Sequence, residues 1–157
     1  MLKIPKQVSV SLSMIIAILF FLICIAGLFI LPELTQVLID LPDNIGSRDQ
    51  ITQIGRVLVL FAAYCIVLTF LLADGLLFTL LVRVRKGLVF TDTTVSLIRG
   101  VSWCCYLLCA LFAFLGYYFQ LALIVSFLAV FLGLCLRVCK NAFEEANAIK
   151  CENDLTV

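Results

Sequence analysis

The chain has 157 residues, of which 64% are hydrophobic and 13% are charged, and its formal net charge is +1. Soluble domains are typically about 45–50% apolar and about 25% charged, so this composition excludes an ordinary soluble domain. It also excludes a disordered chain, which would be poor in apolar residues. The near-neutral charge gives no electrostatic case for direct nucleic-acid binding. We expect one integral membrane domain, residues 1–157, of the all-α class.

The first apolar run covers residues 8–31 and contains no charged residue. About 20 residues of helix cross a hydrocarbon core about 30 Å thick, so the run is long enough to span. A signal peptide is the alternative, because Lys3 and Lys6 precede the run. However, the run is too long for the apolar part of a signal peptide, and Leu31-Pro32-Glu33 offers no small-residue cleavage site. We predict an uncleaved first transmembrane helix.

The second apolar run covers residues 57–81 and contains one charged residue, Asp74. Residues 101–136 then form an uncharged stretch that, as one helix, would be about 54 Å long, nearly twice the hydrocarbon thickness. The stretch must break, and Gly116-Tyr117-Tyr118-Phe119-Gln120 is the natural place because tyrosines favour the interface. We predict helices near 101–118 and 121–138, which brings the number of transmembrane helices to four.

Most Lys and Arg residues lie on one side of this four-span pattern. One side holds nine of them: Lys3, Lys6, Arg83, Arg85, Lys86, Arg99, Arg137, Lys140 and Lys150. The other side, the loop 32–56, holds only Arg48 and Arg56. Because cytoplasmic loops carry the excess of Lys and Arg, we predict that both termini and the loop 82–100 are cytoplasmic.

Short amphipathic segments are predicted on both sides of the membrane. In the outside loop 32–56, helical spacing favours a short helix on the membrane surface over a ligand-sensing lid; the spaced residues are Leu34, Val37, Leu38 and Leu41. In the inside loop 82–100, Lys86-Gly87 can end the second helix. Thr91 is a favourable N-cap, and Phe90 and Val95 have the spacing of a hydrophobic staple. We expect a bent or in-plane helix leading into the third span, and a mostly helical tail, 139–157.

The residues that usually perform chemistry are scarce. The chain has no histidine, so the commonest general base and metal ligand are missing. The eight cysteines form no Cys-x-x-Cys pair, and those inside the apolar runs are expected to serve as small packing residues. Cys139 and Cys151 follow the last run, where lipidation is an alternative. No P-loop, dinucleotide fingerprint or nucleophile elbow occurs. We expect no enzyme activity, no cofactor and no metal site.

Asp74 is the single charged residue in the predicted hydrocarbon region. An aspartate at a helix centre costs about 2.5–3.5 kcal/mol on insertion scales, so we expect it to face other helices. Arg83, Arg85 or Arg137 is expected to be within reach. We favour a polar contact that fixes helix packing over a proton- or cation-linked site, because transporters usually show repeated halves or broken helices.

Two segments stand out as distinctive. The first is Lys86-Gly87-Leu88-Val89-Phe90-Thr91, continued by Val95, Leu97-Ile98-Arg99 and Trp103. The second is the ending Glu152-Asn153-Asp154-Leu155-Thr156-Val157. Both segments resemble a domain-of-unknown-function family of small bacterial four-helix membrane proteins, whose ending reads "EENDLT" plus an aliphatic residue. Cys151 departs from that ending, where the family usually has a second acid. The resemblance implies no established activity. It implies a gene neighbour, a small helix-turn-helix regulator of the Cro/CI type, and so a membrane partner for such a regulator.

We therefore expect a regulatory or interaction protein of the bacterial cytoplasmic membrane. Its cytoplasmic face would bind a soluble partner through Phe90, Thr91, Arg99, Glu152, Asn153, Asp154, Leu155, Thr156 and Val157. One alternative is a small transporter or ion-coupled permease centred on Asp74, and another is a structural subunit of a membrane complex. The sequence leaves the oligomeric state open.

Overall fold

The computed structural model describes residues 6–40, 53–87 and 91–155, which fold into four helices. Helix α1 spans Lys6–Asp40, α2 spans Gln53–Arg85, α3 spans Asp92–Gly116 and α4 spans Gln120–Leu155. Within these ranges there is no strand, and each helix contains a stretch long and apolar enough to cross a membrane. The predicted all-α class with four spanning helices is therefore confirmed.

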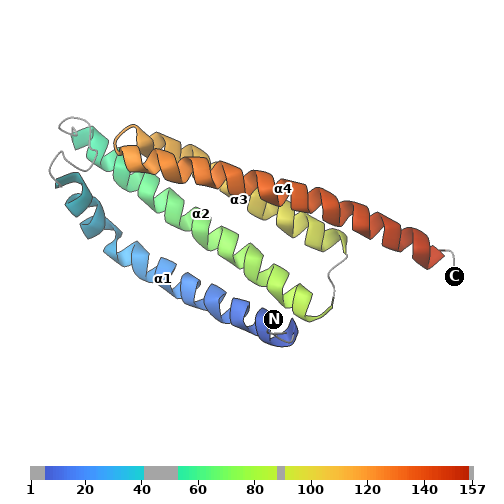
Figure 1. The fold of residues 1–157 in the computed structure, drawn as a ribbon. Helices are drawn as coiled ribbons and strands as arrows, with labels where there is room; N and C mark the ends of the chain where they lie inside the picture. The colour runs from blue at the N-terminus through green and yellow to red at the C-terminus, as the bar shows by residue number, and fades with distance from the viewer. Residues whose placement is uncertain (1–5, 41–52, 88–90, 156–157) are drawn as a thin grey trace, which may run out of the picture.

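The helices lie along one long axis and alternate in direction (Figure 1). At one end of the molecule α1 begins, α2 ends, α3 begins and α4 ends; we call this the terminal end. At the opposite end, which we call the hairpin end, α3 turns directly into α4. An even number of alternating helices places the start of α1 and the end of α4 on the same side.

Helix α1 continues through Pro32, which lies inside it. Proline has no N–H for the carbonyl four residues earlier, and such sites bend a helix. Figure 1 shows this bend where the colour of α1 passes from light blue to teal. Residues 33–40 thus extend α1, which differs from the separate surface helix expected from the spacing of Leu34 and Val37. The remainder of that spacing, at Leu41, lies outside the described residues.

The turn between α2 and α3 follows from local sequence signals. Gly87 follows the end of α2 with a φ of 76°, a left-handed conformation that glycine adopts without steric cost. Thr91 caps α3: its hydroxyl accepts a hydrogen bond from the Thr94 N–H at 3.4 Å. The predicted helix end at Gly87 and the predicted N-cap are confirmed, whereas Phe90 of the predicted staple lies outside the described residues. From Asp92 onward α3 is unbroken, so the expected lead-in helix is its first part.

Helices α3 and α4 form a tight hairpin inside the long uncharged stretch. Helix α3 ends at Gly116 and α4 begins at Gln120, within the segment where the sequence predicts a break. The Phe119 N–H donates to the Leu115 carbonyl at 2.8 Å and closes the turn. Gly116 is buried, and a Cβ atom there would collide with the side chain of Leu123. The missing side chain therefore allows the two helices to approach closely at the turn.

Small residues line the face of α4 that packs on α3. They recur every three or four positions and are buried: Ala122, Ser126, Ala129 and Gly133. Two hydroxyls cross the interface, because Ser102 Oγ donates to the Gly133 carbonyl at 3.1 Å and Ser126 Oγ donates to the Cys109 carbonyl at 2.9 Å. Small residues and interhelical hydrogen bonds are the usual means of holding helices together in lipid. Among the described residues, α3 and α4 thus form the most extensively packed pair of helices.

The other helices pack in chain order, α1 on α2 and α2 on α3. A row of phenylalanine rings connects them: Phe20 on α1 lies 6.0 Å from Phe70 on α2, and Phe70 lies 6.4 Å from Phe112 on α3. Both pairs are edge-to-face, an arrangement that aromatic rings favour. Beside this row, a buried cluster of Ile66 and Leu108 with Ala129 joins α2, α3 and α4.

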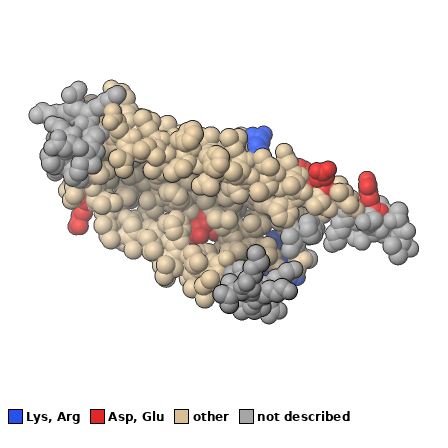
Figure 2. Space-filling view, viewed as in Figure 1, with Lys and Arg blue, Asp and Glu red and all other residues tan. Residues whose placement is uncertain are grey.

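The outward faces of the helices are strongly apolar. Many large apolar side chains along α1, α2 and α4 are exposed. Phe29 on α1 is 82% exposed, and Phe127 on α4 is 73% exposed. Figure 2 shows a largely uncharged surface over the middle of the molecule, interrupted by one acidic group near its centre, with other charged groups mostly toward the terminal end. Soluble monomers rarely expose an apolar surface of this extent. Lipid is the solvent that these faces fit.

Candidate functional site

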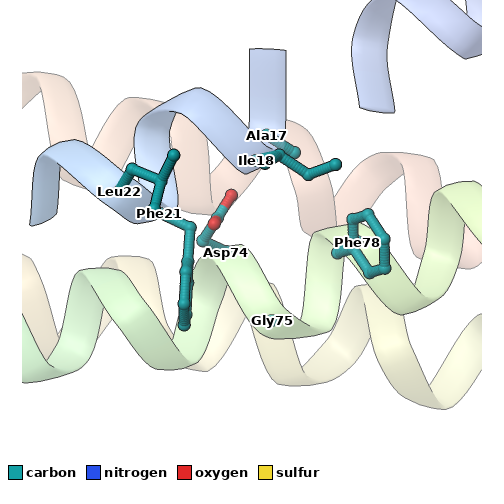
Figure 3. A pocket seen from close by; sticks show the side chains of 7 residues that line it. All are labelled: Ala17, Ile18, Phe21, Leu22, Asp74, Gly75 and Phe78. Atoms are coloured by element: carbon teal, nitrogen blue, oxygen red, sulfur yellow. The ribbon is translucent and has the colours of Figure 1, made fainter. Parts of the chain in front are cut away.

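Asp74 lies near the middle of the molecule, on the side of α2 that faces α1. It is 6% exposed, and its carboxylate points toward α1 beside a cavity of about 250 Å³ (Figure 3). The lining is apolar except for the carboxylate, and the lining residues are Ala17, Ile18, Phe21, Leu22, Asp74, Gly75 and Phe78. The Asp74 side chain thus faces α1 and a cavity in the α1–α2 interface, as expected for a charged residue in the hydrocarbon region.

The expected cationic partners of Asp74 do not reach it. No hydrogen bond or ion pair joins its carboxylate to any other residue in the described ranges, including Arg83, Arg85 and Arg137. Arg83 and Arg85 lie in the last turn of α2, more than two turns toward the terminal end. The predicted polar contact that fixes helix packing is therefore missing among these residues, and the carboxylate oxygens face the cavity without being fully enclosed by the protein.

A second set of polar side chains joins the start of α3 to the last third of α4. Asn147 Nδ2 donates to Asp92 Oδ1 at 2.8 Å. Farther along, Arg99 Nη2 lies 4.0 Å from Glu144 Oε1, and Lys140 forms an ion pair with the other oxygen of Glu144. We call these five residues the polar ladder. Exposed pairs of this kind add little stability, but together they fix the register of α4 on α3.

The residues predicted to bind a partner fall into three groups. Thr91 caps α3 and Arg99 belongs to the polar ladder, so both contribute to the start of α3. Glu152 is exposed on α4, and the backbone of residues 153–155 continues that helix to its end. Phe90, Thr156 and Val157 lie outside the described residues. The structure therefore brings one predicted residue, Arg99, directly against α4.

Sequence reasoning missed Asp92, Glu144 and Asn147 as members of this set. A signal was present, because Lys140, Glu144 and Asn147 are spaced by four and three residues and so share one face of a helix. The missing information was the register between α3 and α4, which places that face against Asp92 and Arg99.

The described cysteines form no group of metal ligands. All seven cysteines whose side chains are described are free thiols, and no group of three potential metal ligands occurs among the described residues. Cys139 is exposed on α4 near the terminal end, whereas Cys151 lies outside the described side chains.

Four apolar helices, lipid-facing outer surfaces and charges gathered toward one end define a multi-pass membrane protein. Residues 43–157 match a family described as "protein of unknown function (DUF2975)", and the chain belongs to that family. The match contains α2, α3 and α4 in full and leaves α1 outside. Comparisons with curated proteins and with solved structures gave no match. The membership supports the resemblance to a domain-of-unknown-function family, whereas the "EENDLT" ending and the neighbouring regulator stay predictions.

Proposed function

We propose that the protein is a non-enzymatic, membrane-anchored interaction protein whose terminal end faces the cytoplasm and binds a soluble protein. One observation carries this proposal: the polar ladder holds α4 as a continuous helix that projects past the start of α3. Asn147 bonds to Asp92, the first residue of α3, so residues 148–155 extend beyond it (Figure 1). Eight residues of helix are about 12 Å long, enough to present two turns to a partner.

The orientation rests on the distribution of cations. Among the described side chains, the terminal end holds Arg83, Arg85, Lys86, Arg99, Arg137 and Lys140. The hairpin end holds Arg56. Because cationic residues accumulate on the cytoplasmic side, the terminal end is cytoplasmic in this proposal.

The projecting part of α4 has the composition of a binding segment. Ile149 is 56% exposed at a position past the polar ladder, where neither α3 nor lipid covers it in this orientation. Glu152 and Asp154 add negative charge to the same turns. Helices with an apolar anchor bind grooves on soluble partners, and acidic groups complement basic surfaces.

A small helix-turn-helix regulator, which the family resemblance suggests, would present such a basic surface through its DNA-binding face. Capture at the membrane would then compete with DNA binding.

Cross-linked affinity purification of the full chain from its native cells tests the proposal. Three forms are compared: the wild type, a deletion of residues 152–157, and a chain in which those six residues are scrambled at constant composition. We expect a soluble protein to be recovered with the wild type and lost with both altered chains. A Gln120→Ala variant at the hairpin end is the matched control and should recover the partner normally. Equal recovery by all four chains would remove the role of the tail.

A further inference from the structure

A basic pocket lies between α3 and α4 toward the terminal end. Its volume is about 310 Å³, and it is lined by Arg99, Ser102, Trp103, Tyr106, Arg137 and Lys140. The four α3 residues follow helical spacing on one face, and the two α4 residues are three positions apart. The pocket holds three cations, two hydroxyls and two aromatic rings, which is a set of groups that suits a phosphate ester.

The charge balance of the pocket stays positive after its internal contacts are counted. Glu144 pairs with Lys140 and lies 4.0 Å from Arg99, and Lys140 Nζ also lies 3.4 Å from Asn141 Oδ1. One carboxylate against three cations leaves two net positive charges. Arg137 has no ion pair within the described ranges. An anion entering the pocket therefore meets an uncompensated guanidinium.

The depth of the pocket matches the boundary between hydrocarbon and headgroups. Arg99 precedes Tyr117 of the hairpin turn by eighteen residues, about 27 Å of helix, and Arg137 follows Gln120 by seventeen, about 26 Å. If the hairpin turn marks one interface, these residues lie near the other edge of a core about 30 Å thick. Trp103 lies about 6 Å deeper than Arg99, is 66% exposed and packs edge-to-face on Tyr106 at 6.2 Å, so its ring borders the hydrocarbon side of the cations.

The walls of the pocket are held in place by the close contact of α3 and α4. Gly133 lies one turn before Arg137, and a Cβ there would stand 3.2 Å from the Tyr106 ring. The Ser102 hydroxyl donates to the Gly133 carbonyl. Leu107, one turn deeper than Trp103, is 53% exposed, so the surface of α3 below the pocket is apolar. A basic site next to an apolar helix surface fits a molecule with an anionic head and an acyl chain.

The geometry points to this pocket as a binding site for the phosphate headgroup of an anionic phospholipid. Basic pockets between transmembrane helices are a known way of holding such headgroups. Arg137 and Lys140 bind the phosphate from α4, Arg99 from α3, and Trp103 covers the glycerol region. The pocket shares Arg99 and Lys140 with the polar ladder. The proposed partner surface is the part of α4 beyond Asn147, which does not line the pocket.

Trp103 is the single tryptophan of the chain, so its fluorescence reports on the pocket directly. The full chain is reconstituted in phosphatidylcholine vesicles that contain a small fraction of lipid with brominated acyl chains, which quench tryptophan on contact. We expect brominated phosphatidylglycerol to quench Trp103 more strongly than brominated phosphatidylcholine at the same fraction. Equal quenching by the two lipids would overturn the proposal.

Charge variants make the test specific. A cation near an anionic membrane surface is worth about fivefold in binding, so Arg137→Gln with Lys140→Gln should lower the preference for phosphatidylglycerol by about 10- to 30-fold. Arg83→Gln with Arg85→Gln removes the same charge from α2, outside the pocket, and should change the preference by less than about twofold. Glu144→Gln should strengthen the preference, because it frees Lys140 and Arg99. Equal losses in both double variants, or a loss in Glu144→Gln, would contradict the site.

A competition measurement distinguishes a phospholipid headgroup from a soluble phosphate as the ligand of the pocket. Inorganic phosphate and glycerol phosphate are added at constant ionic strength to vesicles that contain brominated phosphatidylglycerol. We expect quenching to persist, because a soluble anion lacks the acyl chain. Relief of quenching by either anion at millimolar concentration would assign the pocket to a soluble phosphate instead. Helical circular dichroism and gel filtration of each variant verify that the fold is retained.

Discussion

At the scale of single residues, the burial of Asp74 is the feature that helix packing explains least, because a carboxylate gains nothing from apolar neighbours. A buried polar group without a partner costs about 1–3 kcal/mol in proteins, and a charged group in lipid costs more. The described residues give Asp74 neither a hydrogen bond nor an ion pair, and the adjoining cavity of about 250 Å³ leaves space beside it. The burial of Asp74 is therefore expected to lower the stability of the α1–α2 interface.

Replacing Asp74 with leucine should therefore stabilise the protein. Asp74→Leu removes the buried carboxylate and fills part of the α1–α2 cavity, so we expect the free energy of unfolding to rise by about 1–3 kcal/mol. Unfolding in mixed micelles measures this change. Thr69→Val is the control: the Thr69 hydroxyl is already satisfied by the Cys65 carbonyl at 2.7 Å, and its loss should alter stability by no more than about 0.6 kcal/mol. A marked loss of stability in Asp74→Leu would show that the carboxylate has a structural partner.

The same residue decides between the interaction protein and a transporter. Ion flux into proteoliposomes, measured for the wild type and for Asp74→Asn, distinguishes the two. Absence of flux in the wild type across a broad panel of ions would remove the transporter alternative.

At the scale of elements, the α3–α4 interface depends on a close approach of two backbones. Gly133 faces Tyr106 and Cys105, and even a Cβ atom would be tighter than ordinary van der Waals contact. Gly27 on α1 is the contrasting case, because a Cβ there would meet nothing within 4 Å. Gly133 and Gly27 both lie inside apolar helices, but only Gly133 has a neighbouring helix where a side chain would go.

Gly133→Val should destabilise the protein by about 1–3 kcal/mol, because the larger side chain forces α3 and α4 apart. Gly27→Val should change the unfolding free energy by less than about 0.5 kcal/mol. Unfolding of both variants in the same micelles tests the difference. Equal effects of the two substitutions would mean that the close α3–α4 contact does not support the fold.

Local signals determined which elements the sequence could predict. Thr91, Gly87 and the break after Gly116 were predictable because caps and turns depend on residues that are neighbours in the chain. The path of α1 was not, because Pro32 bends a long helix in this protein instead of ending it. The pairing of Asp92 with Asn147 and of Arg99 with Glu144 was not predictable either, since it depends on the register of two helices.

At the scale of the whole molecule, the helices pack in chain order, and no close backbone contact joins α1 to α4 among the described residues. The family match covers α2, α3 and α4. The polar ladder and the basic pocket both lie on α3 and α4. Helix α1 contributes one wall of the Asp74 cavity. The molecule thus divides into an α3–α4 half, which carries the proposed surfaces for partner and lipid, and an α1–α2 half with a buried acid.

We propose that the four helices cross the bilayer and leave the terminal end in the cytoplasm. Fusions in intact bacteria test it most directly, because alkaline phosphatase is active only outside the cytoplasm and green fluorescent protein fluoresces only inside. We predict a fluorescent C-terminal fusion, an inactive C-terminal phosphatase, and an active phosphatase inserted between residues 43 and 50. An active phosphatase at the C-terminus, or recovery of the chain in the soluble fraction, would contradict the claim.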